Sequence, residues 1–227
     1  MNPFMFFTKS DLAGQIIFVV LCILSLIGWT TMFGKYFQLK RMRERNASFA
    51  NELSNAASVS DVRTQNYANC PYAELTSSAN GALERAQSMS IDSGAQMAHV
   101  ENAIQRSLNS VSHVYESKLI FLGSIVSGAP FLGLLGTVWG VMIAFSGIAM
   151  QNGPATIQSL APGVASALLC TVAGLLVAIP AVFGYNYLLT QAKVLTSELE
   201  NFSSALADRI ELETFVPQQQ ATAETIR

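Results

Sequence analysis

Charged residues are scarce in this sequence. Only 12% of its 227 residues are Asp, Glu, Lys or Arg, about half the share usual in a soluble protein, whereas 51% are apolar. Such a composition excludes an intrinsically disordered chain, which combines low hydrophobicity with high charge. The 13 basic and 15 acidic residues leave a net charge of -2, which excludes a basic nucleic-acid-binding protein. We therefore expect an integral membrane protein.

Cysteine and the common catalytic motifs are scarce as well. Cys22, Cys70 and Cys170 are too few and too scattered for a disulfide framework or a zinc site. The sequence contains no H-E-x-x-H motif, no G-x-S-x-G motif and no phosphate-binding glycine loop. We therefore predict that the protein is not an enzyme and that it binds no metal and no cofactor.

The placement of the few charges predicts three membrane spans. No charged residue occurs from residue 12 to residue 34, and none occurs from residue 119 to residue 192. About 20 apolar residues cross the hydrocarbon core of a bilayer, so the first run is one span and the second is long enough for two. We predict an all-α integral membrane protein with transmembrane helices over 12–34, 119–150 and 162–189.

Basic residues predict the orientation of these spans. Nine of the 13 Lys and Arg residues lie in the segment 35–118, and five of them follow the first span directly. By the positive-inside rule this segment is cytoplasmic, so the N-terminus (1–11) and the polar turn (151–161) are periplasmic and the C-terminus is cytoplasmic. The position of the basic cluster at the end of a span favours this interpretation over a lipid or nucleic-acid patch.

Helical periodicity continues outside the membrane. Apolar residues recur every three or four positions from Met97 to Tyr115, and no Pro or Gly occurs over 95–122. We therefore expect the second span to begin as a cytoplasmic helix and to enter the membrane without a break. The same rhythm predicts a cytoplasmic amphipathic helix over 190–216, so the second and third spans both have long helical extensions.

The remaining soluble parts give weaker patterns. Apolar residues from Leu75 to Ala86 predict a short helix, so we expect 35–118 to be mostly helical. The polar tail 217–227 is predicted to be disordered.

Small residues share one face of each of the last two spans, at 100° per residue. Because lipid tails are as apolar as Leu, membrane helices associate through small residues that let their backbones approach. Pro residues lack an N–H donor and commonly interrupt helices. We predict helix packing through Gly133, Gly136, Gly140, Gly174 and Ala178, and helix breaks or turns at Pro130, Pro162 and Pro180.

Two hydroxyls lie on these small faces, Thr137 and Thr171. Each can bond to a carbonyl one turn earlier in its own helix, line a hydrated pathway, or meet a polar group on another helix. No residue inside the spans titrates between pH 5 and 8, whereas proton carriers in membranes are normally Asp, Glu or His. If the protein handles protons, a partner must supply the carboxylate.

Two long motifs resemble known membrane proteins. The stretch 129–142 (APFLGLLGTVWGVM) resembles the second-span motif of TolQ and ExbB. The stretch 161–182 (APGVASALLCTVAGLLVAIPAV), followed by Tyr185 and Asn186, resembles their third-span motif. The likeness covers nearly the whole chain and identifies it as similar to the MotA/TolQ/ExbB proton-channel family. A lean toward TolQ rests on four residues: Trp29, Leu199, Phe202 and Leu206.

The resemblance implies a function. Members form homopentamers in the bacterial inner membrane, and their second and third spans line a central pore. A dimer of a single-span TolR- or ExbD-like protein occupies the pore and carries the essential Asp. Ion flow driven by the proton-motive force then moves this dimer, which transmits work to a TolA- or TonB-like protein.

The resemblance also assigns the ion pathway. Thr137 and Thr171 match the two pore threonines, and Ser166 stands where the family usually has Glu. The partner's Asp would then be the sole titrating group. Two alternatives remain open, a passive scaffold of packed helices and a small secondary transporter.

Overall fold

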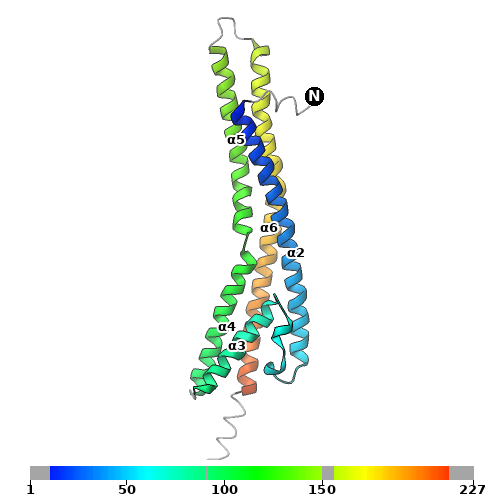
Figure 1. The fold of residues 1–227 in the computed structure, drawn as a ribbon, viewed down its shortest axis with the longest axis vertical. Coiled ribbons are helices and arrows are strands. Elements are labelled where there is room, and N and C mark those ends of the chain that lie inside the picture. The colour runs from blue at the N-terminus through cyan, green and yellow to red at the C-terminus, as the bar shows by residue number, and fades with distance from the viewer. Residues whose placement is uncertain (1–10, 90–91, 150–155, 215–227) are drawn as a thin grey trace, which may run out of the picture. The chain divides into compact units, whose positions relative to one another are not determined.

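The computed structural model describes residues 11–89, 92–149 and 156–214. Every regular element in these ranges is a helix, which confirms the predicted all-α class (Figure 1). The connection between the first two of the five α-helices contains both one-turn 3₁₀ helices. The elements in chain order are α2 (Leu12–Asn55), η1 (Val59–Asp61), η2 (Thr64–Asn66), α3 (Pro71–Ser88), α4 (Ser93–Glu116), α5 (Leu119–Ala149) and α6 (Ile157–Thr214).

Three helical stretches are long and apolar enough to cross a membrane, as predicted. They lie within Leu12–Asn55, Ser93–Ala149 and Leu160–Thr214, and their most apolar parts have mean hydropathies of 2.5, 1.9 and 2.3. Most of these apolar side chains are exposed on the isolated chain; Phe131, for example, is 70% exposed and Leu176 69%. Exposed apolar side chains on long helices are what a lipid environment requires.

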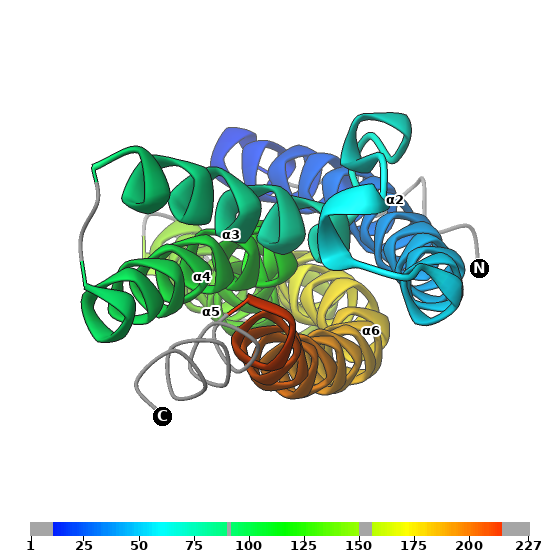
Figure 2. The ribbon, with the colours of Figure 1, turned by 90° about the horizontal axis from the view of Figure 1, so that it is seen from below.

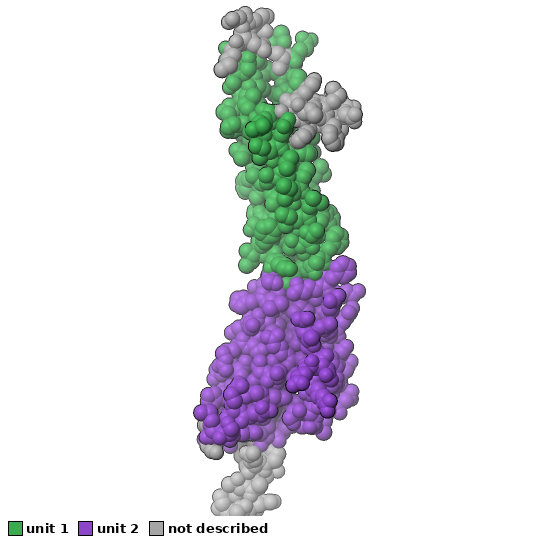
Figure 3. Space-filling view, viewed as in Figure 1, with its two compact units in different colours: residues 1–35, 118–189 green, residues 36–117, 190–227 purple. Residues whose placement is uncertain are grey.

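The chain forms two compact units, coloured separately in Figure 3. The first comprises residues 1–35 and 118–189, and we call it the membrane unit. The second comprises residues 36–117 and 190–227, and we call it the polar unit. Helices α2 and α6 each contribute to both units, so two of the three apolar helices continue well beyond their apolar segments.

The membrane unit is a bundle of α5 with the first part of α2 and of α6 (Figure 1). One residue from each helix forms a buried core cluster: Leu21, Ala129 and Ala178. Since two of these three side chains are methyl groups, the helices approach closely at this point.

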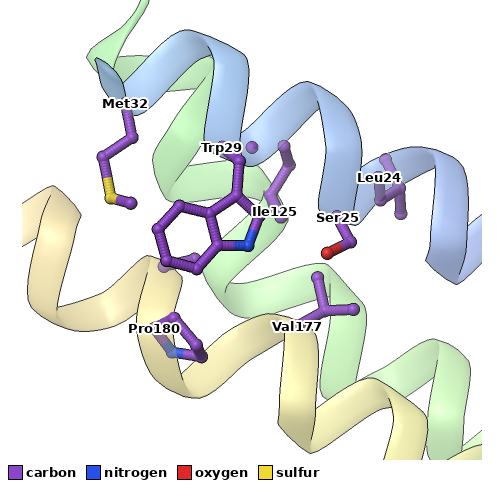
Figure 4. A pocket seen from close by; sticks show the side chains of 9 residues that line it. Leu24, Ser25, Trp29, Met32, Ile125, Val177 and Pro180 are labelled. Carbon is purple, nitrogen blue, oxygen red and sulfur yellow. The ribbon is translucent and has the colours of Figure 1, made fainter.

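Pro180 faces a small apolar pocket of the membrane unit. The pocket is lined from all three helices by residues that include Trp29 and Met32 of α2, Ile125 of α5, and Val177 and Pro180 of α6. Figure 4 shows the Trp29 indole pointing from α2 toward the helix that carries Pro180. A proline ring with aromatic and aliphatic neighbours acts here as packing surface.

A buried polar network centres on one side chain of the polar unit. Asn46 of α2 donates from Nδ2 to the Tyr115 hydroxyl of α4 (3.2 Å). Its Oδ1 accepts from the Tyr72 backbone N–H (3.4 Å) and the Cys70 thiol (3.5 Å) at the start of α3. Burial raises the pKa of Tyr115 far above its ordinary value, so its hydroxyl stays protonated. One amide thereby fixes α2, α3 and α4 to one another.

Within the polar unit, helix α6 packs against α3 and contacts the end of α2. The rings of Tyr72 and Phe202 stack with their centroids 3.9 Å apart. Arg209 of α6 donates to the backbone oxygens of Leu53 (2.7 Å) and Ala56 (2.8 Å) at the end of α2. A helix end leaves its last carbonyls without intrahelical partners, and a cationic side chain there stabilises it. Helices α3 and α4 lie side by side on this unit (Figure 2).

The predicted unbroken helix from the polar segment into the second span is wrong. Helix α4 ends at Glu116 and α5 begins at Leu119. Ser117 adopts an extended backbone (φ -52°, ψ 143°) and Lys118 a left-handed one (φ 67°). A left-handed residue with a side chain costs about 1–2 kcal/mol and is rare. Neither Ser nor Lys is typical of a helix break, so the apolar pattern did not predict this one.

The prolines do not break the helices either. Pro130 lies inside α5, and Pro162 and Pro180 lie inside α6. Each proline removes one backbone donor, a loss that membrane helices tolerate because neighbouring groups can satisfy the freed carbonyl. Helix α6 starts at Ile157, so the end of the predicted turn is helical. Residues 1–10 of the predicted N-terminus, residue 150 at the end of the predicted second span, residues 151–155 of the predicted turn and the predicted tail lie outside the described residues.

Candidate functional site

The small faces of α5 and α6 meet with their backbones in contact. A Cβ atom built on Gly174 would lie 2.7 Å from the Ala129 backbone oxygen and 3.2 Å from the Gly133 Cα. A Cβ atom on Gly133 would lie 2.9 Å from the Cys170 backbone oxygen. Real Cβ atoms do not approach backbone atoms this closely, so only glycine fits at both positions.

The same line of contact continues along both helices. A Cβ atom on Gly136 would lie 2.5 Å from the Cβ of Cys170, and one on Gly140 would lie 2.7 Å from the Cβ of Ala167. Because α5 and α6 are antiparallel, contacts that lie later on α5 lie earlier on α6. Four glycines named from the sequence lie on this line, and Ala178 lies in the buried cluster with Leu21.

The two candidate threonines come together across this contact. Thr171 Oγ1 lies 3.1 Å from the Gly133 backbone oxygen and 3.5 Å from Thr137 Oγ1. Thr137 in turn donates to the Leu134 backbone oxygen of its own helix (2.7 Å). Thr171 reaches the α5 backbone because Gly133 has no side chain to keep it away. Of the alternatives left open by the sequence, Thr137 bonds to a carbonyl of its own helix, and Thr171 meets polar groups on another helix.

Ser166 occupies a different position. Its side chain is buried and donates from Oγ to the Gly163 backbone oxygen one turn earlier (2.9 Å). Five residues separate it from Thr171, which corresponds to about 140° around the helix. The structure thus brings Thr137 and Thr171 together and keeps the Ser166 hydroxyl on its own helix.

Sequence reasoning missed Asp11. Its Oδ2 accepts a hydrogen bond from the Trp139 indole N–H of α5 (3.0 Å). The same carboxylate accepts from the backbone N–H groups of Ala13 (3.2 Å) and Gly14 (3.3 Å), so it caps the start of α2. An Asp directly before an apolar run is a recognisable helix-capping signal. Asp11 is also the only Asp or Glu in the sequence of the membrane unit, 1–35 and 118–189.

Three residues of the basic cluster after the first span are buried or make contacts within the chain. Lys35 is buried, with 1% of its surface exposed. Arg43 forms a salt bridge with Glu198 (3.0 Å), and Arg45 donates to the Ala68 backbone oxygen. These contacts leave fewer basic groups for a lipid or nucleic-acid patch. The orientation of the spans stays a prediction.

Comparisons with known proteins agree with the motifs. The profile of the MotA/TolQ/ExbB proton channel family matches residues 75–201. The chain is 30% identical over 220 residues to the biopolymer transport protein ExbB of Neisseria meningitidis serogroup A, and the alignment covers 92% of this chain and 97% of that protein.

Proteins named TolQ match as well. The chain is 28% identical over 211 residues to the Tol-Pal system protein TolQ of Haemophilus influenzae, with 86% of this chain and 88% of that protein covered. It is 37% identical over 117 residues to TolQ of Pseudomonas aeruginosa, which covers 52% and 50% of the two chains. The family profile and the near-complete alignment to ExbB lead to one conclusion. The chain belongs to the MotA/TolQ/ExbB proton channel family and is a multi-pass inner-membrane protein.

Proposed function

We propose that this protein is the ring-forming subunit of an inner-membrane motor driven by the proton-motive force. In this proposal five copies surround a dimer of a single-span partner of the TolR or ExbD type, and the complex energises a TolA- or TonB-like protein. Family membership supports the role, and the hydroxyl pair across α5 and α6 is the observation in this chain that carries it.

The hydroxyl pair suits a partner carboxylate. A Thr hydroxyl donates one hydrogen bond and accepts others, so it can serve a carboxylate in either protonation state. It does not titrate at physiological pH. The sequences of α5 and α6 within the membrane unit contain no Asp, Glu or His, so the proton carrier must come from the partner.

The Thr171 hydroxyl can exchange its hydrogen-bond acceptor. Thr171 Oγ1 has one proton and two acceptor oxygens within reach, Gly133 O at 3.1 Å and Thr137 Oγ1 at 3.5 Å. It can donate to only one of them at a time. When a partner carboxylate comes within reach, the Thr171 hydroxyl can donate to it instead. The contact between α5 and α6 then loses one hydrogen bond, and the hydroxyl proton gains a new acceptor. In the proposal, each such exchange accompanies one protonation step of the partner's Asp.

Substitution of the threonines tests the proposal. Thr171→Val and Thr137→Val remove the hydroxyl but keep the β-branched shape, so the complex should assemble and lose its activity. Thr171→Ser should retain activity because it keeps the hydroxyl. Thr30→Val is the matched control: this membrane-unit hydroxyl bonds to its own helix at Leu26 O (2.9 Å).

The alternatives give different results. Full activity of both threonine-to-valine variants would contradict the motor proposal and favour the passive scaffold. Substrate flux by the isolated protein, without a single-span partner, would favour the small secondary transporter. Assembly is followed by co-purification and activity by growth that depends on the energised outer-membrane process.

A further inference from the structure

The first turn of α2 is held against both of the other membrane helices. Asp11 accepts from the Trp139 indole of α5 at 3.0 Å. Three residues later, the backbone oxygen of Gly14 accepts from the thiol of Cys170 on α6 at 3.9 Å. Trp139 lies two residues after Thr137, and Cys170 lies directly before Thr171. The two contacts therefore lie at the level of the hydroxyl pair.

The contacts lie on other sides of α5 and α6 than the hydroxyls. At 100° per residue, Trp139 is about 200° around α5 from Thr137, and Cys170 is about 100° around α6 from Thr171. A hydrogen bond on the far side of a helix restrains its rotation about its own axis.

We propose that Asp11 is the positioning residue for the Thr137–Thr171 pair. Its carboxylate caps α2 and binds the Trp139 indole, so that α2 fixes the rotation at which α5 presents Thr137 to Thr171. The hydrogen-bonding oxygen, and not the negative charge, carries this role, because Trp139 and the first turn of α2 both contribute neutral N–H donors. The activity readout of this inference rests on the proposed motor function, whereas its structural readout does not.

Two substitutions separate the oxygen from the charge. Asp11→Asn keeps an acceptor for the indole and is an equally good helix cap, so it should behave like the wild type. Asp11→Ala removes both the cap on α2 and the acceptor for the indole. Trp139→Phe keeps an aromatic ring in place and leaves the α2 cap intact but removes the N–H donor, so it should reproduce the part of the Asp11→Ala effect that depends on the indole contact.

Fluorescence of Trp139 in the full-length protein gives the structural readout. The chain has two Trp residues, so Trp29→Phe leaves Trp139 as the only indole. In that background we expect Asp11→Ala to increase quenching by acrylamide and to shift the emission, and Asp11→Asn to leave both unchanged. Unchanged quenching in Asp11→Ala would contradict the proposed contact, and an Asp11→Asn spectrum like that of Asp11→Ala would contradict the role of the oxygen.

Activity of the intact complex gives the second readout. An ordinary intramolecular hydrogen bond is strong enough for its loss to lower activity about tenfold. We expect Asp11→Ala and Trp139→Phe each to show this loss. The double variant should lose no more activity than Asp11→Ala alone, because both substitutions remove the same bond between the indole and the carboxylate. Additive losses, or an inactive Asp11→Asn that assembles normally, would overturn the inference. If the threonine variants of the previous section are active while the Trp139 spectra respond as expected, the motor proposal fails and the positioning contact stands.

Discussion

The glycines and threonines of α5 and α6 lie where the two helices meet, and the threonine contacts depend on the glycines. Thr171 reaches the Gly133 carbonyl only because neither Gly133 nor Gly174 has a side chain at the crossing. The sequence predicted both residue sets from one helical face, but it could not show which hydroxyl would cross to the other helix. That choice depends on the register of the two helices, which three-dimensional contact fixes and one-dimensional periodicity does not.

Substitution of the crossing glycine tests this packing at the residue scale. Gly174→Ala places a Cβ atom 2.7 Å from the backbone oxygen of Ala129, which cannot move aside as a side chain can. We expect a loss of about 1–3 kcal/mol of stability, typical of overpacking. Gly128→Ala on α5 is the control, because nothing lies within 4 Å of its added Cβ atom. Thermal unfolding of the purified protein should separate the two variants, and equal melting temperatures would contradict the close crossing.

The sequence predicted which segments are helical, but it did not predict where every helix ends. The predicted short helix around residues 75–86 corresponds to α3, and the predicted extension of the third span is part of α6. The predicted first span, 12–34, is followed by a segment predicted to be mostly helical, and α2 continues into that segment as far as Asn55. Its polar part carries a buried apolar stripe at helical spacing, Leu39, Met42, Phe49 and Leu53. The end of α2 is fixed by a distant residue, Arg209, that no local pattern reveals.

The junction after α2 provides a pH-dependent contact at the element scale. Glu213 accepts from the Ser58 hydroxyl and the Val59 N–H, both at 2.9 Å, and from Arg209 Nε at 2.6 Å. Burial by itself raises the pKa of Glu213, but the hydrogen bonds from Val59, Arg209 and Ser58 outweigh it and hold the pKa below its ordinary value.

The sign of the pH effect follows from that shift. A carboxylate whose folded-state pKa is lowered stabilises the folded state fully above its unfolded pKa, about 4.3 for Glu. This contribution is lost as the pH falls through the lower folded-state pKa. We expect Glu213→Gln to weaken hydrogen-exchange protection at residues 58–61 at pH 7, and the difference from wild type to shrink below about pH 4.3. A difference that stays constant down to the acid limit would contradict the ionised contact.

At the scale of the whole molecule, charge separates the two units. Asp11 is the only acidic residue in the sequence of the membrane unit, whereas the other 14 of the 15 lie in the polar unit. This division was visible in the sequence as charge-free runs and predicted the three spans. The break at Ser117 and Lys118 falls at the boundary between the units, and the sequence did not reveal it because both residues are compatible with a helix.

Thiol labelling tests the predicted orientation. In a variant without the three native cysteines, Ser110→Cys places an exposed thiol on α4 of the polar unit, and Asn152→Cys places one in the predicted periplasmic turn. A membrane-impermeant maleimide should label Asn152→Cys in intact cells and Ser110→Cys only after the inner membrane is opened. The reverse pattern would contradict the orientation predicted from the basic residues.

The composition of the complex tests the central claim most directly. The predicted spans contain no Asp, Glu or His, so the proposed motor requires a partner that brings such a group. The decisive measurement is the mass of the complex extracted from native membranes in mild detergent. The account predicts five copies of this chain together with a small single-span protein that has an Asp in its membrane segment. A monomer, or a ring without such a companion, would contradict it.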